Sequence, residues 1–175
     1  FFNYALSAAR FSVARQAPDG SWPYGENHVQ KWIDNFHTGY NLVALHRFCH
    51  YTGDSEFIEN IKKGFHFYKI HFFLEGCLAK YYHNKLYPID VHSVAQSIIT
   101  LLELKELDKN NIDLALSVCR WGIDNMRNKE GYFYYQKKRF YMNKIPYMRW
   151  SQAWMLLALS TLLEHWEQDT TLEKG

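Results

Sequence analysis

The sequence predicts an all-α fold of three helical hairpins that form an arc or half-barrel of an α/α toroid. A Gly-x-apolar turn recurs with spacings of 56 and 55 residues, at Gly20, Gly76 and Gly131. An amide side chain recurs with spacings of 55 and 56 residues, at Asn41, Gln96 and Gln152. The segments between these positions show helical periodicity. Repeats of this length are typical of stacked supersecondary units that bury their apolar faces against one another.

Six helices are expected, in three consecutive pairs: residues 3–16 with 35–52, 55–73 with 91–107, and 110–127 with 148–166. The first helix ends at the turn around Pro18 and Gly20, and the second ends at Gly53. Pro88 fits just ahead of the start of the fourth helix. The aromatic loop Tyr132–Tyr135 is expected to form a short hairpin strand, because Tyr and Phe at this density favour strands.

The second, fourth and sixth helices are expected to form the inner layer of the toroid. Beyond a polar first turn they are almost wholly apolar, as in Met155–Leu159, and such a helix is buried on most sides. The first, third and fifth helices are then outer. We therefore expect Leu101 and Leu156 to be buried, and Leu→Ala at either position to cost about 2–5 kcal/mol of unfolding free energy.

The composition favours one well-packed domain over residues 1–175. The chain is 47% hydrophobic and 18% aromatic, which excludes an intrinsically disordered protein. The net charge is +2, and the Lys and Arg residues are scattered rather than gathered in a basic stripe. We therefore expect no nucleic-acid partner. The sequence does not specify an oligomeric state.

We expect a cytoplasmic location and no membrane span. No apolar run reaches the roughly 18 residues that a membrane span requires. The cysteines are odd in number and lie in apolar segments, which is typical of reduced, packed thiols: Cys49, Cys77 and Cys119. The chain begins with Phe1 rather than Met, and no signal peptide follows. It is therefore expected to be part of a longer chain.

The polar residues of this architecture gather where the long loops meet the N-termini of the inner helices, on one face of the toroid. Two carboxylate–imidazole pairs there are suited to acid–base catalysis, and the expected catalytic residues are Asp34, His37, Asp90 and His92. Aromatic rings, amides and charged groups accompany them in one shared cavity. The expected substrate-binding residues are Trp22, Glu26, Trp32, Tyr82, Gln96, Arg149, Trp150 and Gln152.

The same two pairs have other interpretations. Asp34-x-x-His37 and Asp90-x-His92 contain zinc-type ligands, but neither spacing is a recognised zinc pattern and no Cys falls in register. No metal or other cofactor is therefore expected. The polar groups could instead cap helices and satisfy the loop backbone. The sequence contains no Gly-rich phosphate loop and no nucleophile elbow.

The segment Gln16–Trp22 resembles the Gln…Gly-x-Trp element that joins helix pairs in terpenoid cyclases, which share the α/α toroid with protein prenyltransferases. This resemblance implies the toroid fold, and it makes an isoprenoid-handling toroid the alternative function. The second and third repeats keep Gly76 and Gly131 but lose the Gln and Trp. The closely spaced aspartates of the cyclases and the zinc set of the prenyltransferases are not matched.

Three further segments resemble a group of bacterial toroid proteins associated with surface-polysaccharide loci: Trp32–Tyr40, Pro88–Gln96 and Arg149–Trp154. The Ala95-Gln96 element is also similar to one in the helical domain of uronyl C5-epimerases. These resemblances imply a carbohydrate-binding or carbohydrate-modifying module linked to bacterial polysaccharide metabolism, with a saccharide or glycan precursor as its ligand. The sequence leaves open whether the module is an epimerase, a lyase, a hydrolase or a helical scaffold without a small ligand.

Overall fold

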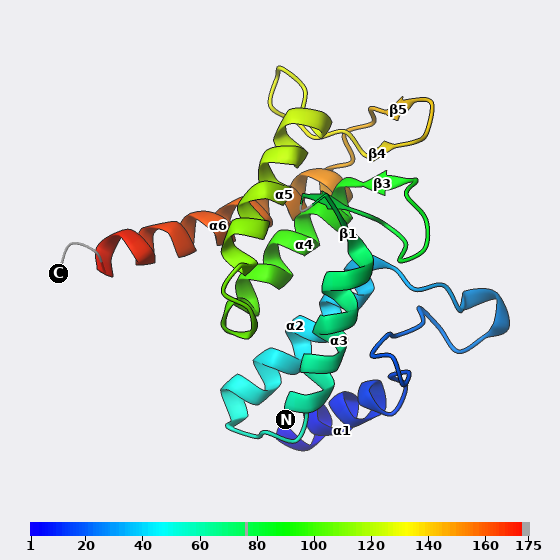
Figure 1. Cartoon of the computed structure of the whole chain (residues 1–175), viewed down its shortest axis with the longest axis vertical. Helices are drawn as coiled ribbons and strands as arrows, with labels where there is room; N and C mark the ends of the chain where they lie inside the picture. The colour runs from blue at the N-terminus through cyan, green and yellow to red at the C-terminus, as the bar shows by residue number, and fades with distance from the viewer. Residues whose placement is uncertain (76, 173–175) are drawn as a thin grey trace.

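The computed structural model describes residues 1–75 and 77–172, and this part of the chain contains six α-helices (Figure 1). Their bounds are α1 Phe2–Val13, α2 Asn35–Thr52, α3 Ile58–Phe72, α4 Val91–Glu103, α5 Asn111–Met126 and α6 Ala153–Leu172. A 3₁₀ turn, η2 (Lys105–Leu107), follows α4, and a π-helical turn, η3 (Met148–Gln152), precedes α6. None of the helices in the described ranges is both long and apolar enough to span a membrane.

Helices α2, α4 and α6 form an inner layer, because α4 packs against both α2 and α6. The outer helix α3 packs on α2, α5 packs on α4, and α1 lies against α2. The connections from an inner helix to the next outer helix are short, whereas the connections that lead into the inner helices are long. This is the layering of an α/α toroid. The predicted all-α fold, an arc of such a toroid, is confirmed.

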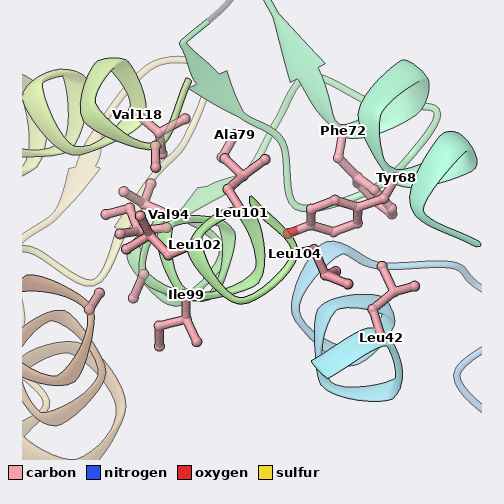
Figure 2. Close-up of a cluster of buried hydrophobic side chains, with 14 of the residues drawn as sticks. Leu42, Tyr68, Phe72, Ala79, Val94, Ile99, Leu101, Leu102, Leu104 and Val118 are labelled. Carbon is pink, nitrogen blue, oxygen red and sulfur yellow. The ribbon is translucent and has the colours of Figure 1, made fainter. Parts of the chain in front are cut away.

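Helix α4 forms the centre of the hydrophobic core. Every residue from Val91 to Leu102 is buried. Figure 2 shows Leu101 and Leu102 of α4 between Val118 of α5 and Leu42 of α2. Burial of apolar surface stabilises the fold by about 25 cal/mol per Å². Helix α4 is therefore covered on every side, as its apolar sequence predicted. It lies between α2 and α6 and connects the two ends of the arc.

Helix α6 is less buried than predicted. Met155 and Ala158 are fully buried, but Leu156 is 68% exposed and Leu163 is 63% exposed. The reason is its place at the end of the arc: α6 packs on α4 and then extends away from the other helices (Figure 1). The expectation that Leu156 is buried is therefore wrong, whereas Leu101 is fully buried as expected.

A buried hydrogen-bond network joins α2, α3 and α4 beside the start of α2. The Tyr68 hydroxyl donates to Asn35 Oδ1 at 2.8 Å, and Asn35 Nδ2 donates to Ser97 Oγ at 3.1 Å. All three side chains are fully buried. An unpaired polar group in such a place costs about 1–3 kcal/mol, so the network fixes the register of the two inner helices.

Short strands hold the long loops that lead into the inner helices. Strand β1 (Phe73–Leu74) pairs with β2 (Leu78–Ala79). Strands β3 (Ile89–Asp90), β4 (Gln136–Lys137) and β5 (Met142–Asn143) form an antiparallel sheet in that order.

The expected strand over Tyr132–Tyr135 is wrong. Phe133 makes only an isolated bridge with Arg127, and the hairpin begins at Gln136. The position of the strand is decided by pairing with β3, which the aromatic composition of the loop does not encode.

Two of the three repeat glycines adopt a backbone conformation that other residues rarely adopt. The φ angle is 94° at Gly20 and 105° at Gly131. A Cβ atom on Gly20 would lie 2.4 Å from the carbonyl oxygen of Lys63, so the first turn packs directly on α3. Gly76 lies outside the described residues.

Candidate functional site

The inner helices α2 and α4 each begin at a buried aspartate. Asp34 Oδ1 accepts a hydrogen bond from the backbone N–H of His37 at 3.0 Å, and Asp90 Oδ1 accepts one from the backbone N–H of His92 at 2.9 Å. These N-caps satisfy N–H groups that have no partner within the helix. Both histidines consequently lie in the first turns of neighbouring inner helices.

His37 and Asp34 form a hydrogen-bonded pair. His37 Nδ1 lies 2.9 Å from both carboxylate oxygens of Asp34, and Trp32 Nε1 donates to Asp34 Oδ2 at 3.1 Å. The Asp34 side chain is fully buried, whereas the His37 side chain is 40% exposed. Because the carboxylate holds the hydrogen on Nδ1, Nε2 is the nitrogen left to accept a proton. This is the arrangement of a general base that a carboxylate orients.

His92 lies deeper, among aromatic rings. Its ring stacks on Phe36 at a centroid distance of 4.6 Å and on Trp154 at 4.5 Å, and Trp150 meets it edge to face at 4.3 Å. Its Nε2 forms a hydrogen bond with the Tyr40 hydroxyl. Burial, with a smaller contribution from His37, lowers the pKa of His92 to about 3. His92 is therefore neutral at neutral pH.

Asp90 is a buried carboxylate with three hydrogen-bond donors. In addition to the N-cap, Gln136 Nε2 donates to Oδ2 at 2.9 Å and Trp150 Nε1 donates to Oδ1 at 3.2 Å. Burial raises the pKa of Asp90 to about 6, and these hydrogen bonds oppose the rise. Asp90 thereby ties α4 to β4 and to η3.

Three partly exposed aromatic rings lie beside the histidines. Tyr24 stacks on Trp32 at a centroid distance of 4.5 Å and an interplanar angle of 12°, and it meets His37 edge to face at 4.7 Å. Trp150 meets His92 from the start of the last inner helix. Tyr24 is 45% exposed, Trp32 37% and Trp150 36%. The site therefore offers flat apolar faces next to hydrogen-bonding groups.

The structure brings together many of the residues that the sequence indicated. Tyr82 also belongs to this group, because its backbone pairs with that of Asp34 in an isolated bridge. The predicted residues that contact one another in this way are Asp34, His37, Asp90, His92, Trp32, Tyr82 and Trp150. We call this set, with Tyr24 and Tyr40, the histidine cluster.

Two predicted ligand residues from the first loop lie elsewhere. Trp22 is buried, its Nε1 donates to the Ser12 carbonyl at 2.9 Å, and a Cβ on Gly64 would lie 2.5 Å from its ring. Trp22 therefore packs the turn against α3. Glu26 is exposed and forms an ion pair with Arg15 at 2.6 Å. The aromatic and acidic character of a loop does not tell which way its side chains point.

The predicted amides also make contacts outside the cluster. Gln152 Nε2 donates to the Phe133 carbonyl at 2.7 Å, and Gln152 Oε1 accepts from the Phe133 N–H at 2.8 Å. Gln96 is buried and donates to Thr100 Oγ1 at 3.0 Å. The Arg149 side chain is exposed in η3 and has no hydrogen bond or ion pair with any residue that the structure describes. Gln96 and Gln152 thus occupy equivalent positions in the repeats but have different hydrogen-bond partners.

The sequence did not indicate Tyr40, Phe36 or Trp154 as parts of the site. A signal existed for Tyr40, which follows His37 by three positions and therefore lies on the same face of α2. No comparable signal existed for Phe36 and Trp154. Their contacts with His92 arise only when α2, α4 and α6 pack together.

An apolar groove of about 500 Å³ lies between α1 and α2. Its walls include Phe1, Phe2, Leu45, Phe48 and Tyr51, and none of its lining residues belongs to the histidine cluster. Over residues 1–75 and 77–172, no group of three or more His, Cys, Asp or Glu side chains is arranged to hold a metal ion.

The fold and the cluster define an α/α toroid with a carboxylate–histidine pair at the N-terminal ends of its inner helices. Among solved structures, the chain is similar to cellobiose 2-epimerase from Bacillus thermoamylovorans, with a TM-score of 0.74 and 13% identity over 95% of this chain and 50% of that chain. It is also similar to a sugar epimerase from a ruminal bacterium, with a TM-score of 0.58 and 16% identity over 77% of this chain and 40% of that chain.

The chain spans half or less of the length of these two epimerases. Identities this low show a shared fold, the α/α toroid, and no more than that. No protein-family model matches the sequence, and no curated protein matches it.

Proposed function

We propose that the protein binds a saccharide at the histidine cluster and modifies it by proton transfer, with His37 as the base. One observation carries this proposal: His37 Nδ1 is held 2.9 Å from both oxygens of the buried Asp34 carboxylate, while the His37 side chain is 40% exposed. The names of the two similar solved structures, both sugar epimerases, support a sugar as the ligand.

The surroundings of His37 suit a sugar better than an isoprenoid. The partly exposed rings of Tyr24, Trp32 and Trp150 can stack on the apolar face of a sugar ring, and the polar groups beside them can bind hydroxyls. An isoprenoid requires an apolar cavity with few buried donors. The apolar groove between α1 and α2 has that character, but it contains no residue of the cluster.

The proposed reaction begins at the carbon next to the carbonyl of an open-chain sugar. His37 Nε2 takes the proton from this carbon, and the electron pair of the C–H bond forms a C=C bond while the carbonyl oxygen becomes an enediolate oxygen. Return of a proton to the opposite face inverts the carbon, and return to the same face exchanges the proton with solvent. Neither outcome requires an oxidant or a reductant.

Glycoside hydrolysis fits the carboxylates less well. A hydrolase requires one carboxylic acid that protonates the leaving oxygen and a second carboxylate near it. Asp34 and Asp90 are both buried, both cap helices and both accept an indole N–H. Neither has an oxygen without a protein partner.

Proton exchange measured by NMR in D₂O tests the proposal. Wild-type protein is incubated with cellobiose, glucose, mannose or glucuronate, and loss of the proton signal at carbon 2 is followed. We expect exchange with at least one sugar, and a decrease of about 100-fold or more in His37→Asn. His50→Asn, at an exposed position near the other end of α2, is the matched control and should exchange at the wild-type rate.

The alternatives predict other outcomes. Calorimetric binding of a sugar without proton exchange would reduce the protein to a carbohydrate-binding module. Binding of an isoprenyl diphosphate with no binding of any sugar would favour the isoprenoid-handling toroid, and binding of neither would favour a scaffold. A bacterial polysaccharide or its precursor as the physiological ligand is also part of the proposal, and the support for it is the sequence resemblance of three segments.

A further inference from the structure

We propose that the Tyr40 hydroxyl, held in place by His92, donates a hydrogen bond to the sugar oxygen that becomes negative when His37 removes the carbon-bound proton. This inference rests on the proposed function and adds a second group to the same site. His37 removes the proton from the carbon, and the Tyr40 phenol stabilises the negative charge on the oxygen. His92 acts through Tyr40 and is a positioning residue.

Tyr40 stands beside His37 on one face of α2. The two residues are three positions apart, and their rings are 5.7 Å apart between centroids at an interplanar angle of 88°. Tyr40 is half-buried, with the ring of Trp154 5.3 Å away on another side. The hydroxyl of Tyr40 has one hydrogen-bond partner among the described residues, His92 Nε2.

The protonation of His92 decides whether the Tyr40 hydrogen is free. Burial keeps His92 neutral, so its imidazole carries a single N–H. Nδ1 is buried and has no hydrogen-bond partner among the described residues. A hydrogen on Nδ1 would be an orphaned buried donor, which is rarer in proteins than an orphaned acceptor.

The favoured tautomer therefore has its hydrogen on Nε2. In that tautomer His92 Nε2–H donates to the Tyr40 oxygen, and the Tyr40 O–H is left free to donate to a ligand. The rings of Phe36 and Trp154 stack on the imidazole and fix the orientation of its plane, which keeps Nε2 directed at the Tyr40 hydroxyl.

The surroundings of Tyr40 keep its hydroxyl protonated. Burial, and after it the carboxylates of Asp34 and Asp90, raise the pKa of Tyr40 above its ordinary value. Tyr40 is therefore a neutral hydrogen-bond donor rather than a second base. A donor aimed at an oxygen that gains negative charge stabilises the transition state more than the ground state.

The chemical step is balanced within the site. The C–H bond breaks and its proton goes to His37 Nε2. Its electron pair moves into the new C=C bond, and the carbonyl π electrons move to the oxygen that accepts the Tyr40 hydrogen bond. Return of the proton from His37 or from solvent restores the carbonyl, so no external reagent is consumed.

Two measurements test the proposal. In the D₂O exchange experiment, Tyr40→Phe should lower the exchange rate by about 10²–10³-fold, as removal of one oxyanion donor does elsewhere, while the calorimetric Kd for the sugar changes much less. Tyr51→Phe, at an exposed tyrosine on the same helix, is the matched control and should exchange like the wild type. Thermal unfolding of each variant checks that it is folded.

The second measurement does not depend on activity. In ¹⁵N-histidine-labelled wild-type protein, long-range ¹H–¹⁵N correlations distinguish protonated from unprotonated ring nitrogens, and we expect His92 to carry its hydrogen on Nε2. Hydrogen on Nδ1, or wild-type exchange in a folded Tyr40→Phe variant, would overturn the role of Tyr40 and leave that of His37 standing. Absence of exchange in the wild type with every sugar would instead overturn the proposed function, and the role of Tyr40 with it.

Discussion

Asp34 and Asp90 occupy equivalent positions in successive repeats: each caps an inner helix and each accepts an indole N–H. Trp32 Nε1 donates to Asp34 at 3.1 Å across two positions of sequence, whereas Trp150 Nε1 donates to Asp90 at 3.2 Å across 60 positions. The same local chemistry is reached once by a neighbouring residue and once by the packing of a distant helix. The two carboxylates are thus a repeated part of the scaffold. The histidines that follow them differ, because His37 is partly exposed and pairs with Asp34 whereas His92 is buried among aromatic rings.

We expect Asp90 to make the stability of the protein depend on pH. Burial raises the pKa of Asp90 from 3.8 to about 6, so between these values the folded state holds a proton that the unfolded state has released. The stabilising contribution is therefore fully present below about pH 4 and is lost as the pH rises through about 6, a change on the order of 3 kcal/mol. In Asp90→Asn this titration is absent. The unfolding free energy of the wild type minus that of the variant should therefore fall by this amount over the same window.

Urea denaturation across this pH window measures the difference. The subtraction cancels the contribution of His92, which has the opposite sign: its pKa of about 3 means stability that is present above 6.5 and lost as the pH falls toward 3. Asp124→Asn, at an exposed position on α5, is the control and should stay within about 0.5 kcal/mol of wild type throughout. A difference for Asp90→Asn that is constant with pH would contradict the prediction.

We expect Leu101→Ala and Leu156→Ala to differ strongly. Leu101 is fully buried at the centre of α4, so its truncation should lower the unfolding free energy by about 2–5 kcal/mol. Leu156 is 68% exposed, so its truncation should change the unfolding free energy by less than about 0.5 kcal/mol. Chemical denaturation of the two variants under identical conditions gives the comparison, and equal losses would show that the exposed face of α6 is covered in solution.

The helices of this protein could be predicted from sequence because each is a long segment rich in apolar residues between turn or capping residues. The expected helix over residues 35–52 coincides with α2, and the expected helix over 91–107 corresponds to α4 and η2. The exposure of Leu156 could not be predicted in this way. An apolar run shows that a helix requires neighbours, but the position of α6 in the arc decides how many neighbours it has.

The site could be predicted in part, for a related physical reason. His37 and His92 follow helix-capping aspartates, so their level in the toroid follows from local sequence. Trp22 and Gln152 were assigned to the site by residue type and position in the repeat, and their partners are the backbone atoms of Ser12 and Phe133. Such contacts depend on how loops fold over the helices, which no periodic pattern records.

We expect Gln152→Ala to destabilise the protein through the loop before β4. The Gln152 amide makes two hydrogen bonds with the backbone of Phe133, which is itself buried. Truncation leaves an N–H and a C=O without a partner, and the expected loss of unfolding free energy is about 1–3 kcal/mol. Amide hydrogen exchange at Phe133 should also become faster. If Gln152→Ala leaves stability unchanged but weakens sugar binding, the residue is a ligand contact after all.

We expect Arg149→Ala to separate acidic from neutral sugars. Arg149 is exposed, immediately precedes Trp150 in η3, and forms no ion pair with a described residue, so its charge is available to a ligand at the cluster. A guanidinium–carboxylate contact contributes about 1.5–3 kcal/mol, and its loss should weaken binding of glucuronate by roughly 10–150-fold while binding of glucose changes little. Calorimetry with both sugars measures the effect, and Arg120→Ala at an exposed position on α5 is the control. An equal loss for both sugars would mean that Arg149 supports the structure of η3, and no loss for either would place the ligand's charge away from this turn.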